Sequence, residues 1–239
     1  MKRRAPILDG RLSAAMELAE GSRVFADIGA DHGRLSTVML LQDERRYGLV
    51  ADISALALEK ARTRITRMGL ADRVTFAVSD GLDALDKLQD HKADTVFILG
   101  MGGETVSGIL DRGRNRLRGA SVILGAQTEL PLVRQTLSAI GYCIRREVIA
   151  SESGRDYILM RAEPGTADYT EEEILLGPVL LKELPLSWRP VLERRERLLS
   201  QGISAMQSTR LNKDQARLAL FEREIGYVRR ALARLRKED

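Results

Sequence analysis

The chain has 239 residues, a formal net charge of +4 and 44% hydrophobic residues. This length and composition allow one large domain, or one domain with an extension, around a sizeable core. No apolar run approaches the roughly 20 residues of a membrane span, and the basic N-terminus lacks the apolar region of a secretory signal. The single cysteine, Cys143, cannot form an internal disulfide or a zinc cluster, so we expect a cytoplasmic protein without a metal centre.

Short apolar runs alternate with amphipathic stretches over residues 23–162. The runs predict strands at 24–27, 47–52, 74–78, 94–99 and 121–125. The amphipathic stretches predict helices at 35–42, 55–68 and 131–140, and shorter helices around 82–88 and 106–110. Because strands alternate with helices, we expect an α/β fold with a doubly wound, mostly parallel sheet. Two final strands, 142–150 and 157–162, have no helix between them and predict an antiparallel edge.

The pattern becomes entirely helical after Pro164-Gly165, which predicts a domain boundary between residues 163 and 164. Near the C-terminus, apolar residues fill the inner positions of a heptad repeat at Leu211, Leu218, Phe221, Ile225, Val228, Leu232 and Leu235. A looser series, with an arginine at one inner position, precedes it at Trp188, Leu192, Arg195, Leu199, Ile203 and Met206. Between the two series lie Ser208, Thr209 and Asn212. We therefore expect residues 164–239 to form an antiparallel coiled-coil hairpin; alternatively, these helices pack on the sheet or on a second subunit.

The segment from Val24 to Arg34 combines a strand, a tight loop and the start of a helix. In α/β folds, ligands bind at the carboxyl ends of the strands. A dinucleotide site needs the pattern G-x-G-x-x-G, but Asp31 occupies the second glycine position, where its carboxylate would repel a phosphate. The chain has no Gly-Lys-Ser/Thr phosphate-binding loop either. S-adenosylmethionine, which carries a cationic sulfonium and an ammonium group, suits these acids better, and Asp27 could hold the ammonium.

Two more acids follow at the ends of consecutive predicted strands. Asp52 ends the second strand, at the spacing where an acid binds ribose hydroxyls in the related dinucleotide fold. Asp80 ends the third strand and could accept a hydrogen bond from an adenine amino group. Together with Asp27 they favour a nucleoside-containing cofactor, although each acid alone could serve only to shape a turn.

Arginines cluster in two short segments of the chain. Alternate arginines in a loop can contact phosphates, which favours a nucleic-acid partner; the alternative is a solvated arginine-rich surface. The clusters are Arg112, Arg114, Arg116 and Arg118, and the pair Arg145 and Arg146.

Three segments of the sequence resemble the bacterial tRNA (adenine-N1)-methyltransferases of the TrmK family, which act on adenine 22 in the D-loop region. They are Asp27-Ile28-Gly29-Ala30-Asp31-His32-Gly33, Ser79-Asp80-Gly81-Leu82 and Gly100-Met101-Gly102-Gly103. The resemblance covers essentially the whole chain, including Arg11-Leu12 and, before the C-terminal hairpin, Leu176-Gly177-Pro178. It implies a Rossmann-like methyltransferase domain that uses S-adenosylmethionine, and a helical appendage that helps to hold tRNA.

The resemblance also implies roles for individual residues. Those expected at the cofactor are Asp27, Gly29, Asp52, Ile53, Asp80, Gly81 and Gly100. Those expected at the target base are Arg11, Asp31, His32, Met101, Gly102, Gly103 and Gln127. The clustering of arginines, independently of the resemblance, predicts Arg112, Arg114 and Arg116 on the RNA. One departure stands out: where the family commonly has Gln-Pro-Asn after the fifth strand, this chain has Gln127-Thr128-Glu129.

The reaction implied is an in-line displacement, in which adenine N1 attacks the methyl carbon and positioning supplies much of the acceleration. We expect Asp31 to stabilise the positive charge that the base gains, or to accept a proton from its amino group. We expect His32 to bond the base or to orient Asp31. Alternatively, Asp31 is a helix N-cap and His32 bonds only backbone. The target adenine must be turned out of its stack, and Tyr142 and Tyr157 are candidates to stack on it or, equally, core residues.

Two other functions remain open from the sequence. One is a methyltransferase that acts on another RNA, on DNA or on a protein; the other is a non-catalytic RNA-binding adaptor that keeps the fold. The heptad seam can close within one chain or between two, so we expect a monomer or a weak homodimer.

Overall fold

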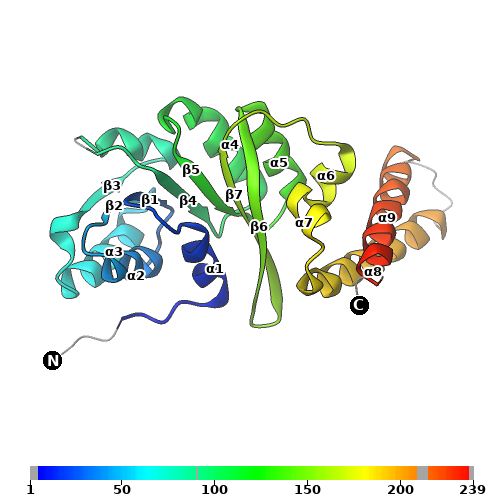
Figure 1. The fold of residues 1–239 in the computed structure, drawn as a ribbon, viewed down its shortest axis with the longest axis horizontal. Helices are drawn as coiled ribbons and strands as arrows, with labels where there is room; N and C mark the ends of the chain where they lie inside the picture. The colour runs from blue at the N-terminus through cyan, green and yellow to red at the C-terminus, as the bar shows by residue number, and fades with distance from the viewer. Residues whose placement is uncertain (1–4, 90, 209–214, 237–239) are drawn as a thin grey trace. The chain divides into compact units, whose positions relative to one another are not determined.

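The structure is a computed structural model that describes residues 5–89, 91–208 and 215–236. It divides into two compact units, Met1–Asp168 and Tyr169–Asp239, coloured blue to green and yellow to red in Figure 1. The boundary predicted at 163/164 falls at the end of the last strand, and the structural boundary lies shortly after it, at 168/169.

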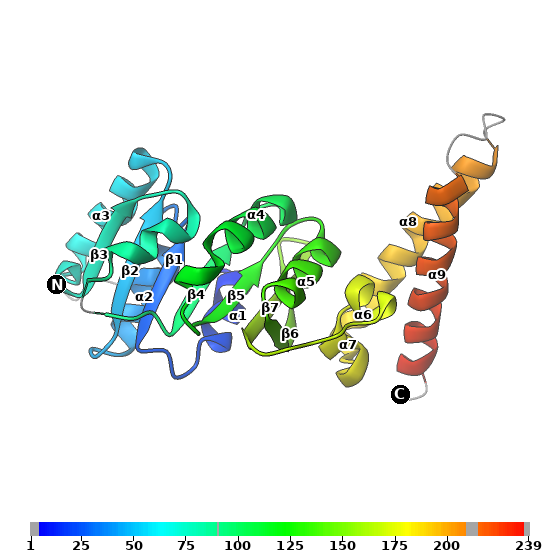
Figure 2. The same ribbon diagram turned by 90° about the horizontal axis from the view of Figure 1, so that it is seen from above.

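The first unit is built on one seven-stranded sheet with the strand order β3-β2-β1-β4-β5-β7-β6, which can be followed across Figure 2. Neighbouring strands from β3 to β5 pair in parallel, while β7 pairs antiparallel with both β5 and β6. The fold is therefore Rossmann-like with an antiparallel edge, as the sequence predicts. The strands are β1 (Val24–Ile28), β2 (Tyr47–Asp52), β3 (Val74–Val78), β4 (Thr95–Leu99), β5 (Ser121–Gly125), β6 (Tyr142–Glu152) and β7 (Arg155–Pro164).

The final hairpin is longer than the sequence predicts. β6 and β7 remain paired up to Glu152 and Arg155, and only Ser153 and Gly154 form the turn between them. Both turn residues have positive φ, 51° and 75°, as in the type I′ turns of two-residue hairpins. The sequence predicts a turn at these two residues. The residues on either side of the turn are polar and give no strand pattern, so the predicted strands are too short.

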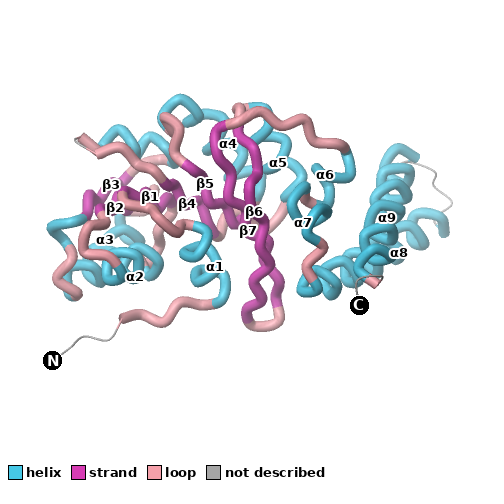
Figure 3. The backbone as a smooth tube through the Cα atoms, viewed as in Figure 1, coloured by secondary structure: helices cyan, strands magenta, loops and turns pink. Residues whose placement is uncertain are grey.

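Helices cover both faces of the sheet (Figure 3). On one face, α1 (Gly10–Leu18), α2 (Arg34–Gln42) and α3 (Ala55–Arg67) share a buried apolar core with alternate strand residues such as Phe25, Val50 and Phe97. On the other face lie the 3-10 helix η2 (Gly81–Lys87), α4 (Gly103–Gly113) and α5 (Leu130–Ala139), which pack side by side. Short 3-10 turns, η1 (Ala71–Arg73) and η3 (Arg114–Arg116), precede β3 and β5. The sequence did not predict α1 as a helix.

The second unit is helical. It comprises α6 (Glu171–Leu176), α7 (Pro178–Glu183), the 3-10 turn η4 (Leu186–Trp188), α8 (Arg189–Ser208) and α9 (Gln215–Leu235). A capping box starts α6, in which the Thr170 hydroxyl accepts from the backbone N–H of Glu173 and the Glu173 carboxylate accepts from that of Thr170.

The long helices α8 and α9 pack antiparallel, since Arg189 at the start of α8 donates to the Leu235 carbonyl at the end of α9, while Gly202 lies against the Phe221 ring. The α9 heptad residues Ile225, Val228, Leu232 and Leu235 are buried, as the heptad pattern predicts. The arginine at an inner heptad position is explained by its partner, because the Glu224 carboxylate is buried and lies 2.6 Å from Arg195. The coiled-coil winding of this pair stays a prediction, and Thr209, Leu211 and Asn212 lie outside the described residues.

Within the described parts of the chain, no helix combines the length and the apolar character that a membrane crossing needs.

Candidate active site

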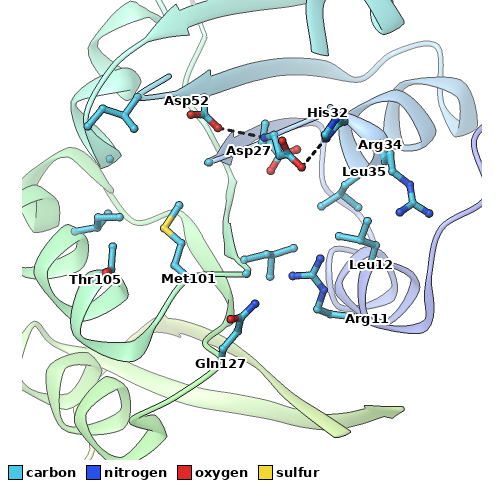
Figure 4. Close-up of a pocket in the computed structure, with 18 of the residues that line it drawn as sticks. Arg11, Leu12, Asp27, His32, Arg34, Leu35, Asp52, Met101, Thr105 and Gln127 are labelled. Atoms are coloured by element: carbon cyan, nitrogen blue, oxygen red, sulfur yellow. Dashed lines mark hydrogen bonds and ion pairs between the residues drawn. The ribbon is translucent and has the colours of Figure 1, made fainter. Parts of the chain in front are cut away.

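A cavity of about 590 Å³ opens at the carboxyl ends of β1 to β4, a volume typical of small-molecule sites (Figure 4). It is lined by every residue that the sequence placed at the cofactor: Asp27, Gly29, Asp52, Ile53, Asp80, Gly81 and Gly100. It is also lined by five of the residues that the sequence placed at the target base: Arg11, Asp31, His32, Met101 and Gln127. One edge of the sheet thus gathers residues from both predicted sets.

The loop after β1 has a conformation that depends on its glycines. The backbone N–H groups of Gly29 and Ala30 both donate to the Ala51 carbonyl at the end of β2, at 2.8 and 3.1 Å. Gly29 has a φ of +72°, and a Cβ there would lie 2.1 Å from the terminal methyl of Met101. The positive φ favours glycine at this position, and a larger residue would also require the flexible end of the Met101 side chain to move.

Asp27 is the buried acid of the cavity. It is 5% exposed, and the Ser36 hydroxyl of α2 donates to its Oδ2 at 2.5 Å. The pKa of Asp27 is raised to about 6, mainly by burial and in part by the nearby charge of Asp52, while the Ser36 hydrogen bonds and the charge of Arg11 oppose this rise. A carboxylate buried without a cationic partner at this distance is suited to receive a cation from a ligand.

Asp52 holds the loop that carries Asp31. Its two carboxylate oxygens accept from backbone N–H groups, Oδ1 from Ser54 at 2.8 Å and Oδ2 from Asp31 at 3.3 Å. Asp52 therefore has a structural function in the free protein, in addition to facing the cavity.

Asp31 and His32, which both line the cavity, form a pair at its rim. Asp31 Oδ2 lies 2.6 Å from His32 Nδ1, and the Asp31 side chain is 69% exposed. Asp31 is not a helix N-cap, because Gly33 occupies that position of α2. His32 bonds the Asp31 carboxylate through its ring and accepts from Arg64 Nε through its carbonyl, at 2.8 Å. Asp31 also has a positive φ of 45°, an unusual conformation that is frequent at functional sites.

The helix α1 and the β6–β7 hairpin close one side of the cavity, and the sequence patterns did not indicate this. The Glu152 carboxylate near the hairpin turn accepts from the Gly10 backbone N–H at 2.8 Å. The Arg11 guanidinium lies 5.8 Å from the centre of the Tyr157 ring, and both residues line the cavity. At the other end, Arg34 of α2 bonds the Asp9 carboxylate at 3.3 Å and the Ile7 carbonyl.

The sequence patterns did not identify several residues that line the cavity, among them Asp9, Thr105 and Glu152. Asp9 and Glu152 could not be found from local patterns, because they meet the cavity only through contacts between distant segments. Thr105 lies in the first turn of α4, directly after the glycine-rich segment, and its position there was the available signal.

Gly102 and Gly103 start α4 instead of lining the cavity. A Cβ on Gly103 would lie 2.4 Å from the Thr128 carbonyl oxygen, so this glycine permits close approach of the loop after β5. The Gly103 N–H donates to the Thr128 hydroxyl at 3.3 Å, and the Gln127 N–H donates to the Met101 carbonyl at 2.9 Å. Gln127 lines the cavity, whereas Glu129 is exposed and does not belong to the described residues that line it. The added carboxylate of the Gln-Thr-Glu segment therefore does not face this cavity.

The arginine cluster lies outside the cavity, and its members are paired with acids. Arg112 lies 3.4 Å from Asp80, Arg114 lies 2.9 Å from Asp111, and Arg116 contacts both Asp83 and Asp86. The assignment of Arg112, Arg114 and Arg116 to RNA stays a prediction.

The two candidate stacking residues, Tyr142 and Tyr157, lie in different environments. Tyr142 is 5% exposed, and its hydroxyl donates to the Ala120 carbonyl at 2.9 Å, so it is a core residue. Tyr157 lines the cavity and is the one of the two that a base could reach.

Among the residues that the structure describes, no group of three or more histidines, cysteines and acids is arranged to hold a metal ion.

Comparison with known proteins decides the family. The family model described as "TrmK: tRNA (adenine(22)-N(1))-methyltransferase" matches residues 25–227. The chain belongs to the TrmK family. One relative is the tRNA (adenine(22)-N(1))-methyltransferase of Bacillus subtilis (strain 168). It is 29% identical to this chain over 219 residues, which cover 87% of this chain and 90% of the relative.

Solved TrmK structures share the fold. The B. subtilis m1A22 tRNA methyltransferase TrmK has a TM-score of 0.84 at 23% identity, over 95% of this chain and 99% of that one. TrmK of M. capricolum, in complex with S-adenosylhomocysteine, has a TM-score of 0.80 at 22% identity and covers 95% of this chain and 99% of its own. The TrmK fold thus extends over both units of the chain.

Proposed function

We propose that the protein transfers a methyl group from S-adenosylmethionine to N1 of adenine 22 in tRNA. The observation that carries this proposal is the acidic cavity at the sheet edge, in a chain that the TrmK model matches over residues 25–227. We assign cofactor binding and catalysis to the first unit and a share of tRNA binding to the second.

The residues of the cavity fit the cofactor. Asp27, buried and without a cationic partner within bonding distance, would hold the ammonium group, and Asp52 would accept from the ribose hydroxyls. Ile53 supports this fit, because it is 71% exposed at the cavity and offers an apolar surface to an adenine ring. Asp80 would accept from the adenine amino group, and the loops with Gly29, Gly81 and Gly100 bring backbone close to the ligand. The cofactor supplies a methyl group on a positively charged sulfur.

Asp31 is the group that we assign to the base. Its carboxylate is open to solvent at the rim, so it can approach an adenine that enters the cavity. A negative charge there stabilises the positive charge that develops on the base as N1 gains the methyl group. His32 keeps the Asp31 carboxylate in place through their 2.6 Å contact, and Met101 and Tyr157 offer soft and aromatic surfaces for the base.

We further propose that Arg112, Arg114 and Arg116 contact tRNA phosphates. Their pairs with acids are exposed, and exposed ion pairs contribute only about 0–1 kcal/mol, so phosphates can compete for these arginines. We also propose that the protein acts on tRNA in the cytoplasm, as a monomer or a weak homodimer.

Methyl incorporation into tRNA transcripts tests the proposal. A transcript with adenine 22 should accept one methyl group at N1, and the same transcript with guanine 22 should accept none. Equal incorporation into both would overturn the assignment of the base.

Calorimetry with S-adenosylmethionine separates the alternatives. Cofactor binding without methylation of any tRNA would favour a methyltransferase for another substrate. Absence of cofactor binding would favour an RNA-binding adaptor.

A further inference from the structure

A second cavity lies beside the first and shares His32 with it. It has a volume of about 710 Å³ and lies between the N-terminal segment at Pro6 and the helix α3. The residues that the argument uses are Leu56, Lys60, Arg64 and Arg67, which follow one another at helical spacing along a single face of α3.

This face of α3 is positively charged. Lys60, Arg64 and Arg67 have no carboxylate partner among the described residues. The acid that lines the cavity, Glu59, lies 3.5 Å from Arg62 on the same helix, so its charge is already partly compensated. This arrangement contrasts with Arg112, Arg114 and Arg116, each of which contacts an aspartate.

Helix stability explains only part of this pattern. Arg64 and Arg67 lie in the last turn of α3, where cations interact favourably with the helix dipole. That effect does not extend to Lys60 in the middle of the helix. Nor does it explain Leu56, an apolar side chain that is 72% exposed beside Lys60.

His32 connects the two cavities physically. Its ring contacts Asp31 in the first cavity, and its carbonyl accepts from Arg64 Nε in the second. Because His32 lines both cavities, a nucleotide whose base is held at Asp31 lies next to the second cavity. The continuity with the first cavity and the positive charge together select a polyanion that is connected to the base.

We propose that the second cavity binds the ribose-phosphate backbone of the nucleotides next to the target adenine, with Lys60 and Arg67 contacting phosphates and Leu56 contacting a neighbouring sugar or base. This inference rests on the proposed function, since it extends the site of the same RNA. Arg64 contacts the same backbone while it holds His32 in place.

The test compares two full-length double variants that each remove two positive charges. K60Q/R67Q changes the proposed contacts and leaves Arg64 intact. K87Q/K92Q is the matched control, because Lys87, at the end of η2, and Lys92, before β4, are exposed cations without carboxylate partners among the described residues and line neither cavity. Equal melting temperatures would show that both variants fold.

For K60Q/R67Q we expect the Kd for the tRNA transcript to rise about tenfold and the slope of log K against log[salt] to fall by about 1.4–1.8, the contribution of two phosphate contacts. The Kd for S-adenosylmethionine should stay at the wild-type value. The control should bind tRNA nearly as the wild type does. Equal weakening in both variants, or in neither, would overturn the inference.

A chemical change in the RNA locates the contacts. A tRNA with a neutral methylphosphonate linkage on one side of adenine 22 should bind the wild type more weakly, and on that RNA the difference between wild type and K60Q/R67Q should shrink. A full difference with a neutral linkage on either side would overturn the inference, because the cations would then contact distant phosphates. If the wild type does not methylate tRNA at adenine 22, the proposed function fails, and the inference fails with it. If the wild type methylates tRNA normally and K60Q/R67Q binds tRNA as tightly as the wild type, only the inference fails.

Discussion

Asp27 is the residue at which folding and ligand binding oppose each other. Burial raises its pKa from 3.8 to about 6, which means that the folded protein binds this proton more tightly than the unfolded chain. The contribution of Asp27 to stability therefore falls as the pH rises from about 4 to 6, and its full cost is present above pH 6. An ammonium group in the cavity would reverse this preference by favouring the charged form.

Asp27→Asn should therefore stabilise the ligand-free protein. The variant removes the buried charge, so its free energy of unfolding at pH 7.5 should exceed that of the wild type by roughly 2–3 kcal/mol. The gain should decrease from pH 6 to pH 4 in urea titrations. S-adenosylmethionine should raise the melting temperature of the wild type above pH 6, less so below it, and hardly that of Asp27→Asn. A variant that binds the cofactor normally would remove Asp27 from the ammonium site.

Asp31 should act on the reaction and not on cofactor affinity. Asp31→Asn keeps the size of the side chain and tolerates the positive φ, but it loses the negative charge at the rim. We expect kcat on tRNA to fall by about 10²–10³-fold with the Kd for S-adenosylmethionine unchanged. Asp72→Asn, which changes an exposed acid of η1, is the control and should leave both values unchanged. Full turnover by Asp31→Asn would refute the proposed role.

At the scale of elements, the parallel strands were the part most accessible from sequence. The runs at 47–52, 74–78 and 121–125 match β2, β3 and β5. The strands β2 and β5 are buried on both faces and therefore form continuous apolar runs between turn residues. The edge strand β3 is only partly buried but has a similar apolar composition. The acids at the strand ends could also be predicted to lie close together, because the carboxyl ends of parallel strands meet at one edge of the sheet.

The elements that close the cavity were not accessible in this way. The helix α1 buries only Ala15 and Leu18 fully, which is too few residues for a clear helical period. Its position depends on contacts with distant segments, namely Glu152 near the β6–β7 turn and Arg34 of α2. Such contacts carry no local sequence signal, so Glu152 was missed, and Arg11 was identified only through the resemblance.

The packing of α5 on β6 supplies a test of stability at this scale. Arg134 and Glu147 form an ion pair at 2.9 Å with side chains 1% and 0% exposed. Glu147→Ala leaves a buried guanidinium without this partner, so we expect the free energy of unfolding to fall by about 3–5 kcal/mol. The double variant R134M/E147L replaces both charges by apolar groups and should recover most of this loss in urea unfolding. A double variant as unstable as the single one would show that the pair contributes specific bonds that packing cannot replace.

At the scale of the whole molecule, the chain joins two units that each have a core of their own. The described residues that line the cavity, from Asp9 to Tyr157, belong to the first unit. The second unit is rich in arginine, and several of its cations make only exposed pairs with glutamates, such as Arg229 with Glu196 and Arg230 with Glu172. Such pairs can exchange for phosphates at little cost. The division of labour that this implies is methyl transfer in the first unit and RNA affinity shared by both.

Removal of the second unit should therefore separate the two ligands. For a chain ending at residue 168 we expect a cooperative thermal transition, because the sheet and both of its helical layers are retained. Calorimetry should give a Kd for S-adenosylmethionine within about threefold of the full chain, whereas the Kd for tRNA should rise at least about tenfold as phosphate contacts are lost. The truncated chain should still methylate tRNA at high concentration, since Asp27 and Asp31 are intact. Unchanged tRNA affinity would contradict the assigned division, and loss of cofactor binding in a folded fragment would show that the second unit supports the cavity directly.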